Sequence, residues 1–444
     1  MHAGLFRTSV HSIQRIAEHR SEQKGFYRFL KNDKVCEDKL TKELANRCGK
    51  LTKGKIVLSI QDTTEVNLFR HTNRIDKSSG VGDIADSRGG IGFMIHPSLV
   101  IDALSCFPLG FSDIKMWNRS IDMEDKHERD YKNLPIEDKE SYKWVESSNK
   151  TKEALKEAKA IIIVQDREGD IFDQFADIPD EQTFLLIRSQ FNRRTDSNEK
   201  LWTTLGKSTV LGQYELQVTA DSRRNTSART ATIEVRGIEI TIKRPKNNKK
   251  EGAKLVSIYA IEAKEINTTV KEPIHWRLAT TWPVNGFEDC ACVIEWYTWR
   301  WQIEELFRTL KKEGYNIEAS ELENGWAIRK LAIMMMDVII KLMQMRIVYN
   351  RPEEEGQEAA SVFSEQEQHC LEETGRRLEG KTKQLQNPYQ PKSLKWAVWV
   401  IARLGGWKGY KSQRPPGLTT LQEGLNRFYA IFNGWSIQKD VGTR

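Results

Sequence analysis

Apolar residues recur with two different periods along this chain, and the changes in period divide it into regions. Residues 1–50 place apolar side chains at helical spacing among many charged ones, for example at Ile13 and Ile16. A β-rich run, KIVLSI, occupies 55–60, and the most strongly apolar short run, AIIIV, occupies 160–164. A continuous apolar run such as AIIIV predicts a strand that is covered on both faces. We therefore expect a helical N-terminal region followed by a sheet with flanking helices.

The pattern changes again after residue 200. Between about 200 and 281, apolar and polar residues alternate with period two, which predicts antiparallel strands. Because this stretch separates the AIIIV strand from the next long helix, we interpret it as a β subdomain inserted into an α/β core. The predicted regions are an N-terminal helical region (1–50), an α/β core with a mixed sheet and flanking helices (51–350, with the insertion at about 200–281), a mobile surface connection or weak helices (351–392) and a C-terminal helical module (393–444).

Composition narrows the class of protein and its compartment. The six cysteines show no CxxC pair, so a zinc site is not expected. No secretion signal is evident, which favours reduced thiols. The most apolar run, 331–340, is too short to cross a bilayer and contains Asp337, which favours a buried helix. We therefore expect a cytoplasmic protein with no membrane partner.

Positive charge is concentrated towards the C-terminus. The formal net charge is +7, and residues 371–444 contain 13 Lys and Arg against 5 Asp and Glu. A basic segment that also contains tryptophan is suited to contact with a polyanion such as nucleic acid. An ordinary solvated surface remains the alternative interpretation of this segment.

Two acidic residues stand where apolar strands are predicted to end. Asp62 follows the 55–60 run and Asp166 follows the 160–164 run. A strand that ends in an acid presents a carboxylate at the edge of a sheet. Taken alone, either residue is more often a turn former or a charge at a helix N-terminus than a catalytic group.

A third candidate acid, Glu304, lies in a segment with informative spacing. Tyr297, Arg300, Glu304 and Lys311 are separated by 3, 4 and 7 residues, which places all four on one face of a helix. Three carboxylates can hold two divalent cations roughly 3.5–4 Å apart, and hard oxygen ligands favour Mg²⁺, with Mn²⁺ as a substitute. Arg300 and Lys311 are suited to hold phosphates beside such ions. The pattern therefore predicts metal-dependent phosphodiester chemistry.

These motifs resemble those of the DDE transposases of the insertion-sequence-four family, in order and over nearly the whole chain. The segment 297–311 is similar to the family's Tyr-Arg-Glu-Lys signature. The other matching segments are Asp62-Thr63-Thr64 (first acid), Asp166-Arg167-Glu168-Gly169-Asp170 (second acid), Tyr27-Arg28-Phe29-Leu30 (N-terminal DNA-binding region), and Trp396 with 401–406 (C-terminal dimerisation module).

The resemblance implies a ribonuclease-H-like fold interrupted by a β insertion before the helix that carries the glutamate. It implies cut-and-paste transposition by strand cleavage, hairpin formation and strand transfer, with two Mg²⁺ ions on Asp62, Asp166 and Glu304. It also implies a homodimer on double-stranded transposon ends and target DNA in the bacterial nucleoid. By the same resemblance, the residues that contact DNA are Tyr297, Arg300, Lys311, Trp276 (which receives a flipped base), Arg188 (beside the hairpin) and Arg28.

One departure from the family's pattern leaves alternatives open. The region 1–50 is shorter than the family's end-recognition domain, so we expect a truncated form of that domain. A chain of this kind can act instead as a non-transposing inhibitor that dimerises with a full-length transposase. A ribonuclease-H-like metal nuclease without transposition activity is the remaining alternative.

Overall fold

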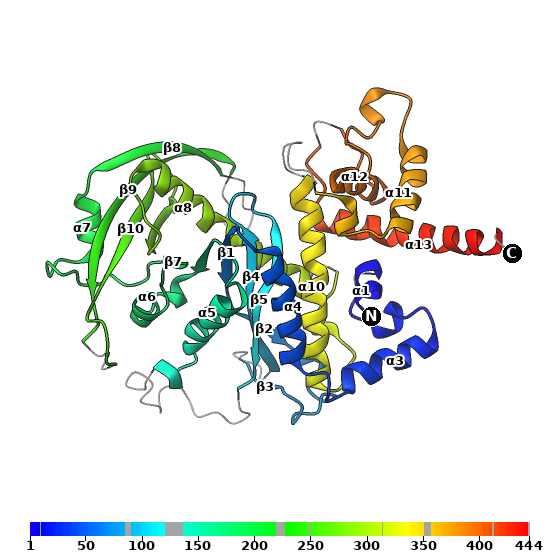
Figure 1. Ribbon diagram of the computed structural model, residues 1–444, viewed down its shortest axis with the longest axis horizontal. Coiled ribbons are helices and arrows are strands. Elements are labelled where there is room, and N and C mark those ends of the chain that lie inside the picture. The colour runs from blue at the N-terminus through cyan, green and yellow to red at the C-terminus, as the bar shows by residue number, and fades with distance from the viewer. Residues whose placement is uncertain are drawn as a thin grey trace.

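The computed structural model describes the chain except for residues 9, 85–89, 120–135, 219–226, 247, 249, 313, 350–356, 411–412 and 443–444, and describes the main chain alone at 384 and 437–442. The described residues form a mixed 11-stranded sheet flanked by helices (Figure 1). Its strands are β1 (Ile56–Gln61), β2 (Thr64–Asn67), β3 (Gly82–Asp83), β4 (Ile91–Asp102), β5 (Pro108–Trp117), β6 (Ala160–Gln165), β7 (Thr183–Arg188), β8 (Val210–Val218), β9 (Arg229–Lys243), β10 (Leu255–Ile266) and β11 (His275–Thr280). The order is β2-β4-β1-β6-β7-β11-β10-β9-β8, and β3 and β5 also pair with β4.

The central strands are parallel and buried on both faces. β1 pairs in parallel with β6, and β6 pairs in parallel with β7. Alternate residues of each strand enter different cores: Ile162 lies in one apolar cluster and Ile163 in another. The AIIIV run is therefore buried throughout, as the sequence predicts for a strand covered on both faces.

Helices cover both faces of this central sheet. On one side lie α5 (Tyr142–Ala154) and α6 (Phe172–Asp177). On the other lie α8 (Phe287–Trp299), α9 (Trp301–Lys311) and α10 (Gly325–Tyr349), whose apolar residues share a cluster with Leu58 and Val164. α10 contains the apolar run 331–340 and is largely buried. Within the described residues, no helix combines the length and apolar character needed to cross a membrane.

The segment predicted as an inserted β subdomain extends the same sheet. β8, β9, β10 and β11 are antiparallel to one another, as predicted, but β11 also pairs with β7 through Leu278, Ala279 and Thr280. α7 (Leu201–Lys207) packs on β9 and β10. Ile242 and Ile258 of the extension share an apolar cluster with residues of β6 and β7. The extension and the central strands form one sheet because β11 is hydrogen-bonded to β7.

Pro97 lies inside a continuous strand. On one side of β4, β5 pairs along almost its whole length, including Pro97 opposite Ile114. On the other side, β2 pairs with residues up to Ile95 and β1 with residues from Ser98 onward. Proline therefore falls between two partner strands, where its missing N–H removes no ladder hydrogen bond. Asp62 leaves the sheet opposite this gap, between the end of β1 and the start of β2.

Helical layers occupy both ends of the chain. The N-terminal helices are α1 (His2–Thr8), α2 (Ile13–Ile16), α3 (Arg20–Lys31) and α4 (Glu37–Leu51), and α1 packs on α10. The C-terminal helices are α11 (Glu365–Leu378), α12 (Leu394–Leu404) and α13 (Leu418–Gly442), whose end projects beyond the other helices (Figure 1). Short 3₁₀ segments are η1 (Phe69–His71), η2 (Ile136–Asp138), η3 (Arg167–Gly169), η4 (Ile317–Ala319), η5 (Ala359–Ser361) and η6 (Lys383–Leu385).

Of the two interpretations of residues 351–392, a mobile connection or weak helices, the helical one fits the described part of the segment. This part contains α11, which begins with a capping box between Ser364 and Glu367. Cys370 and Leu371 of this helix are buried in the core shared with α12. The cap and the apolar face stabilise a helix whose charged composition indicated a connection. The C-terminal helical layer therefore begins about thirty residues before position 393.

Candidate active site at the carboxyl ends of β1 and β6

Asp62 and Asp166 lie side by side. In the parallel pairing of β1 with β6, Ile60 is opposite Val164, so the residues two positions further on leave adjacent strands at the same sheet edge. Both carboxylates are half-buried. Asp62 Oδ1 accepts a hydrogen bond of 2.8 Å from the backbone N–H of Thr63, which fixes its orientation.

The predicted helical face at 297–311 is interrupted at one residue. α8 ends at Trp299 and α9 begins at Trp301, with Arg300 forming the cap of both helices. Arg300 keeps right-handed helical angles (φ −50°, ψ −29°), but its neighbours form 3₁₀-type bonds, Arg300 N–H to Tyr297 O and Ile303 N–H to Arg300 O. Because the backbone stays helical, Tyr297, Arg300 and Glu304 still reach the same site.

Arg300 joins two of the three acids. Its Nη1 donates to Asp62 Oδ2 at 3.0 Å and its Nη2 donates to Glu304 Oε1 at 2.7 Å. The third acid, Asp166, accepts a hydrogen bond of 3.2 Å from the Tyr297 hydroxyl. Each of the three predicted acids is therefore hydrogen-bonded to one of the side chains predicted to accompany them.

The electrostatics of this cluster disfavour uncompensated negative charge. Burial raises the pKa of Asp62 to about 6; Arg300 opposes this rise, and the charges of Asp166 and Glu304 add to it. Burial, together with the charge of Asp166, also raises the pKa of the Tyr297 phenol to about 12. Burial lowers the pKa of Arg300, but its anionic neighbours outweigh this effect and raise the pKa above its ordinary value. At neutral pH, Tyr297 is a hydrogen-bond donor and Arg300 is a cation.

The donor chemistry of the cluster fits a hard divalent cation. All three acids offer carboxylate oxygens, the ligands that Mg²⁺ and Mn²⁺ prefer. Burial of Asp62 beside two further carboxylates calls for a compensating positive charge, which Arg300 supplies in this structure. Among the described side chains, no group of three or more His, Cys, Asp and Glu is already arranged around a metal position. Arg300 engages one oxygen of Asp62 and one of Glu304, so a cation held by all three acids would use their remaining oxygens or replace this contact.

Three further predicted residues lie around this cluster. Trp276 on β11 is half-buried, and its ring lies 6.2 Å from that of Tyr297 in a tilted edge contact. Arg188, the last residue of β7, pairs with Leu278, and its charge is close enough to Tyr297 to oppose the rise of the Tyr297 pKa. Lys311 lies at the end of α9, where its Nζ donates to Thr64 Oγ1 at 3.4 Å and lies 3.4 Å from Glu318 Oε1.

Arg28 is not part of this cluster. It is exposed on α3, a helix that packs against α10. With Lys24, Tyr27 and Lys31 it lines a shallow cavity of about 550 Å³. Any contribution of Arg28 to DNA contact is therefore separate from the three acids.

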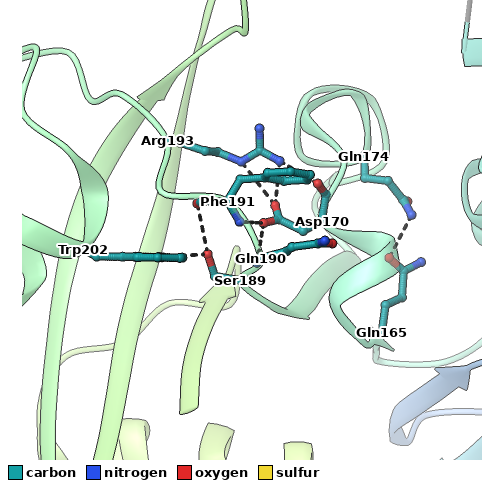
Figure 2. A network of polar contacts seen from close by, with 8 residues as sticks. All are labelled: Gln165, Asp170, Gln174, Ser189, Gln190, Phe191, Arg193 and Trp202. Atoms are coloured by element: carbon teal, nitrogen blue, oxygen red, sulfur yellow. Dashed lines mark hydrogen bonds and ion pairs between the residues drawn. The ribbon is translucent and has the colours of Figure 1, made fainter. Parts of the chain in front are cut away.

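A buried glutamine network supports the acids and was not predicted from sequence. Gln61 and Gln165 each precede an acid, and Gln165 Nε2 donates to Gln61 Oε1 at 2.8 Å. Gln165 Oε1 accepts from Gln174 Nε2 on α6 at 2.8 Å (Figure 2). All three glutamines are fully buried. A Cβ at Gly169 would lie 2.3 Å from Gln165 Oε1, so glycine is required where the turn after Asp166 crosses this network.

His96 and Thr63 form a second unpredicted support. His96 lies in the gap of the β4 pairing, and its Nδ1 is 2.9 Å from Thr63 Oγ1. Burial, with the charges of Lys143 and Lys115, lowers the pKa of His96 well below its ordinary value. The imidazole is therefore neutral and holds the residue after Asp62. The only sequence signal was the position of His96 beside a proline within an apolar run.

Comparison with known proteins adds little to this geometry. No protein-family model matches the chain. One similar solved structure is a cryo-EM structure of the piggyBac transposase synaptic complex with hairpin DNA. The TM-score is 0.33 and the sequence identity 9%, with 85% of this chain and 58% of that chain covered. The chain thus spans less than two thirds of the length of the protein it matches, and a likeness this distant carries no functional argument.

Proposed function

We propose that this chain is a metal-dependent DNA transposase of the DDE type, with a ribonuclease-H-like catalytic core. The observation that supports this best is the convergence of Asp62 and Asp166, on neighbouring parallel strands, with Glu304 and its companions from the helical segment. The strand order β5-β4-β1-β6-β7, with three antiparallel strands followed by two parallel ones, is compatible with such a core.

Asp62, Asp166 and Glu304 would hold Mg²⁺, which supplies Lewis-acid activation of a phosphodiester when bound. Arg300 donates two N–H groups in a fork, and a phosphate can accept the same fork once the carboxylates are compensated. Tyr297 keeps its proton on the hydroxyl oxygen and can donate it in a hydrogen bond to a phosphate oxygen. These residues position the scissile phosphate.

Trp276 and Arg188 would serve hairpin formation at the transposon end. Closing a DNA hairpin bends the backbone sharply, and this is eased when a base leaves the stack. The half-buried indole of Trp276, whose ring contacts that of Tyr297, would stack on such a base. Arg188, Lys311 and, on a separate surface, Arg28 would bind backbone phosphates. A homodimer formed through the C-terminal helices would bring two DNA ends together.

The test uses labelled duplexes that carry the inverted repeats bounding the reading frame, incubated with purified protein and Mg²⁺ or Mn²⁺. Nicked and then hairpinned ends are expected. Glu304→Ala and Asp166→Asn should each lower the cleavage rate by at least about 10³-fold, since metal activation is worth several kcal/mol. Glu295→Ala, which removes an exposed carboxylate from α8, is the matched control and should leave the rate unchanged.

The outcomes separate the alternatives. Cleavage of arbitrary DNA or of an RNA–DNA hybrid without hairpins indicates a metal nuclease. Absence of cleavage together with inhibition of a full-length homologue indicates a dimerising regulator. Full activity of the Glu304→Ala protein would show that the assignment of the acids is wrong.

A further inference from the structure

A basic pocket lies beside the proposed active site, on the side of the sheet extension. It has a volume of about 1050 Å³. Its walls come from η2 and the residues that follow it, the start of α6, the loop 189–200 after β7, and residues 243–246, 248 and 250 at and after the end of β9. Phe191, Arg194, Lys200, Lys243, Arg244 and Lys246 are among its lining residues. None of them belongs to the cluster around the three acids.

The acidic side chains of the wall already have partners. Asp170 is buried and forms an ion pair of 2.6 Å with Arg193. Asp173 accepts two hydrogen bonds, of 2.9 and 3.0 Å, from the Asn248 amide. Glu137 lies 3.8 Å from Lys250, which also forms an ion pair of 2.8 Å with Asp177. These carboxylates do not compensate the remaining cations of the pocket.

Several cations of the pocket lack a carboxylate partner among the residues that the structure describes. Arg194 and Lys246 are exposed, and neither forms an ion pair there. The guanidinium of Arg244 lies over the Phe172 ring at 5.7 Å, and its buried Nε has no hydrogen-bond acceptor in the described part of the chain. Lys243 and Lys200 donate to neutral oxygens of Asn198 and Asn192. A buried donor without a protein acceptor can donate to an oxygen of a bound ligand or of water.

An aromatic ring stands at the mouth of the same pocket. Phe191 is 52% exposed, and the Arg193 guanidinium lies 5.4 Å from its ring centroid. The loop that carries it is held in place, since Asp170 Oδ2 accepts the backbone N–H groups of Gln190 and Phe191 at 2.7 and 2.9 Å (Figure 2). An exposed aromatic ring on an anchored loop, beside unpaired cations, is typical of a surface that stacks nucleic-acid bases.

The pocket is connected to the acids through the same short segments. Asp170 comes four residues after Asp166 in one turn, and Arg188 immediately precedes the loop that carries Phe191. We propose that this pocket binds a single-stranded segment of DNA, with phosphates on Arg194, Arg244 and Lys246 and a base stacked on Phe191. This proposal rests on the proposed function, since it describes how a strand leaving the acids is held.

The test measures binding without cleavage, by fluorescence anisotropy with a labelled 20-nucleotide oligo-dT strand and a mixed-sequence duplex of the same length, in EDTA. Phe191→Ala should weaken single-strand binding by about 5- to 150-fold, the range for one stacked base, and leave duplex binding unchanged. The triple variant Arg194→Gln/Arg244→Gln/Lys246→Gln should weaken single-strand binding and reduce the slope of log K against log salt by about 2.

The control variant Lys53→Gln/Lys156→Gln/Lys159→Gln carries the same change in charge near the amino ends of β1 and β6. It should bind both probes like the parent protein. Circular dichroism melting of each variant checks that the fold is intact. The proposal would be overturned if Phe191→Ala and the triple pocket variant bound the single strand as tightly as the control variant does. It would also be overturned if they lost equal affinity for the strand and for the duplex.

The two proposals fail separately. Asp166→Asn should retain single-strand affinity, because it leaves the pocket intact. If the parent protein binds the strand through the pocket but cleaves no DNA, the proposed function fails and the pocket stands. If cleavage is normal and the pocket variants bind like the control, only the pocket proposal fails.

Discussion

The central strands and the extension strands belong to one sheet but are covered differently. β1 and β6 are buried along almost their whole length. β8 alternates between half-buried and exposed residues, because one of its faces is open to solvent. Strands packed on both faces hold the acids at fixed positions, whereas the open extension can present loops and cations to a large ligand. The proposed chemistry is thus assigned to the buried strands, and the proposed strand binding to the loops that follow β7 and β9.

The largest difference between the central strands and the extension is expected when a large apolar side chain is replaced by alanine. Ile163→Ala on β6 should lower the free energy of unfolding by about 2–5 kcal/mol, because it leaves a cavity between packed layers. Leu216→Ala on β8 should cost less than about 1.5 kcal/mol, because its side chain is only half-buried. Urea unfolding followed by circular dichroism measures both. Equal losses at the two positions would contradict the distinction between the strands.

In the glutamine network, substitution at the buried position should again lower the free energy of unfolding more than substitution at an exposed position of β8. This difference should be smaller than the one between Ile163 and Leu216. Gln165→Leu leaves the Gln174 amide and the Gln61 carbonyl without their partner, at a cost of about 1–3 kcal/mol per buried unsatisfied group. Because the network lies directly behind the acids, the cleavage rate should fall while DNA affinity is retained. The matched control is Gln213→Leu, at an exposed position of β8, where the change should stay within about 0.5 kcal/mol. A parallel loss of rate and DNA affinity would show a general structural effect instead.

The smallest effect concerns a charged group of the extension. Burial tends to raise the pKa of Glu262, but hydrogen bonds from His275 and Arg277 outweigh it and lower the pKa. A lowered folded-state pKa contributes stability above the unfolded value, near 4.5, and this contribution is lost as the pH falls through the folded value. Above pH 4.5, we expect the parent protein to be more stable than Glu262→Gln by less than about 1 kcal/mol. The difference should disappear as the pH falls below the folded-state pKa of Glu262. Unfolding midpoints measured from pH 6 to pH 3 provide the check, and a difference independent of pH would rule out the ion pair as its source.

Local signals explain what the sequence predicted. Asp62 and Asp166 became candidates because each follows a short apolar run, and the helical spacing from Tyr297 to Glu304 added a third candidate acid with its companions. The capping box at Ser364 and Glu367 was an equally local signal, but the charged composition of 351–392 obscured it.

The remaining features depend on contacts between distant segments. Three of them involve strands that are far apart in sequence. β11 pairs with β7, β4 changes its partner from β2 to β1 at Pro97, and Gln61 is hydrogen-bonded to Gln165. No glycine or proline marks the break between α8 and α9 at Arg300. The break lies where the Arg300 guanidinium contacts Asp62 and Glu304. Such features require the assembled sheet.

The contact of Arg300 with two acids has a consequence for the order of assembly. Many metal-binding domains depend on the ion to fold, because their ligands repel one another without it. Here the chain carries an internal counterion, so the three carboxylates can be brought together before any divalent cation arrives. Under the proposed function, the chain can fold before the metal binds, and ion binding then replaces part of the positive charge that Arg300 supplies. Chelation should then abolish catalysis while shifting the melting temperature little, which would allow the protein to persist in a folded, inactive state until DNA and metal are both present.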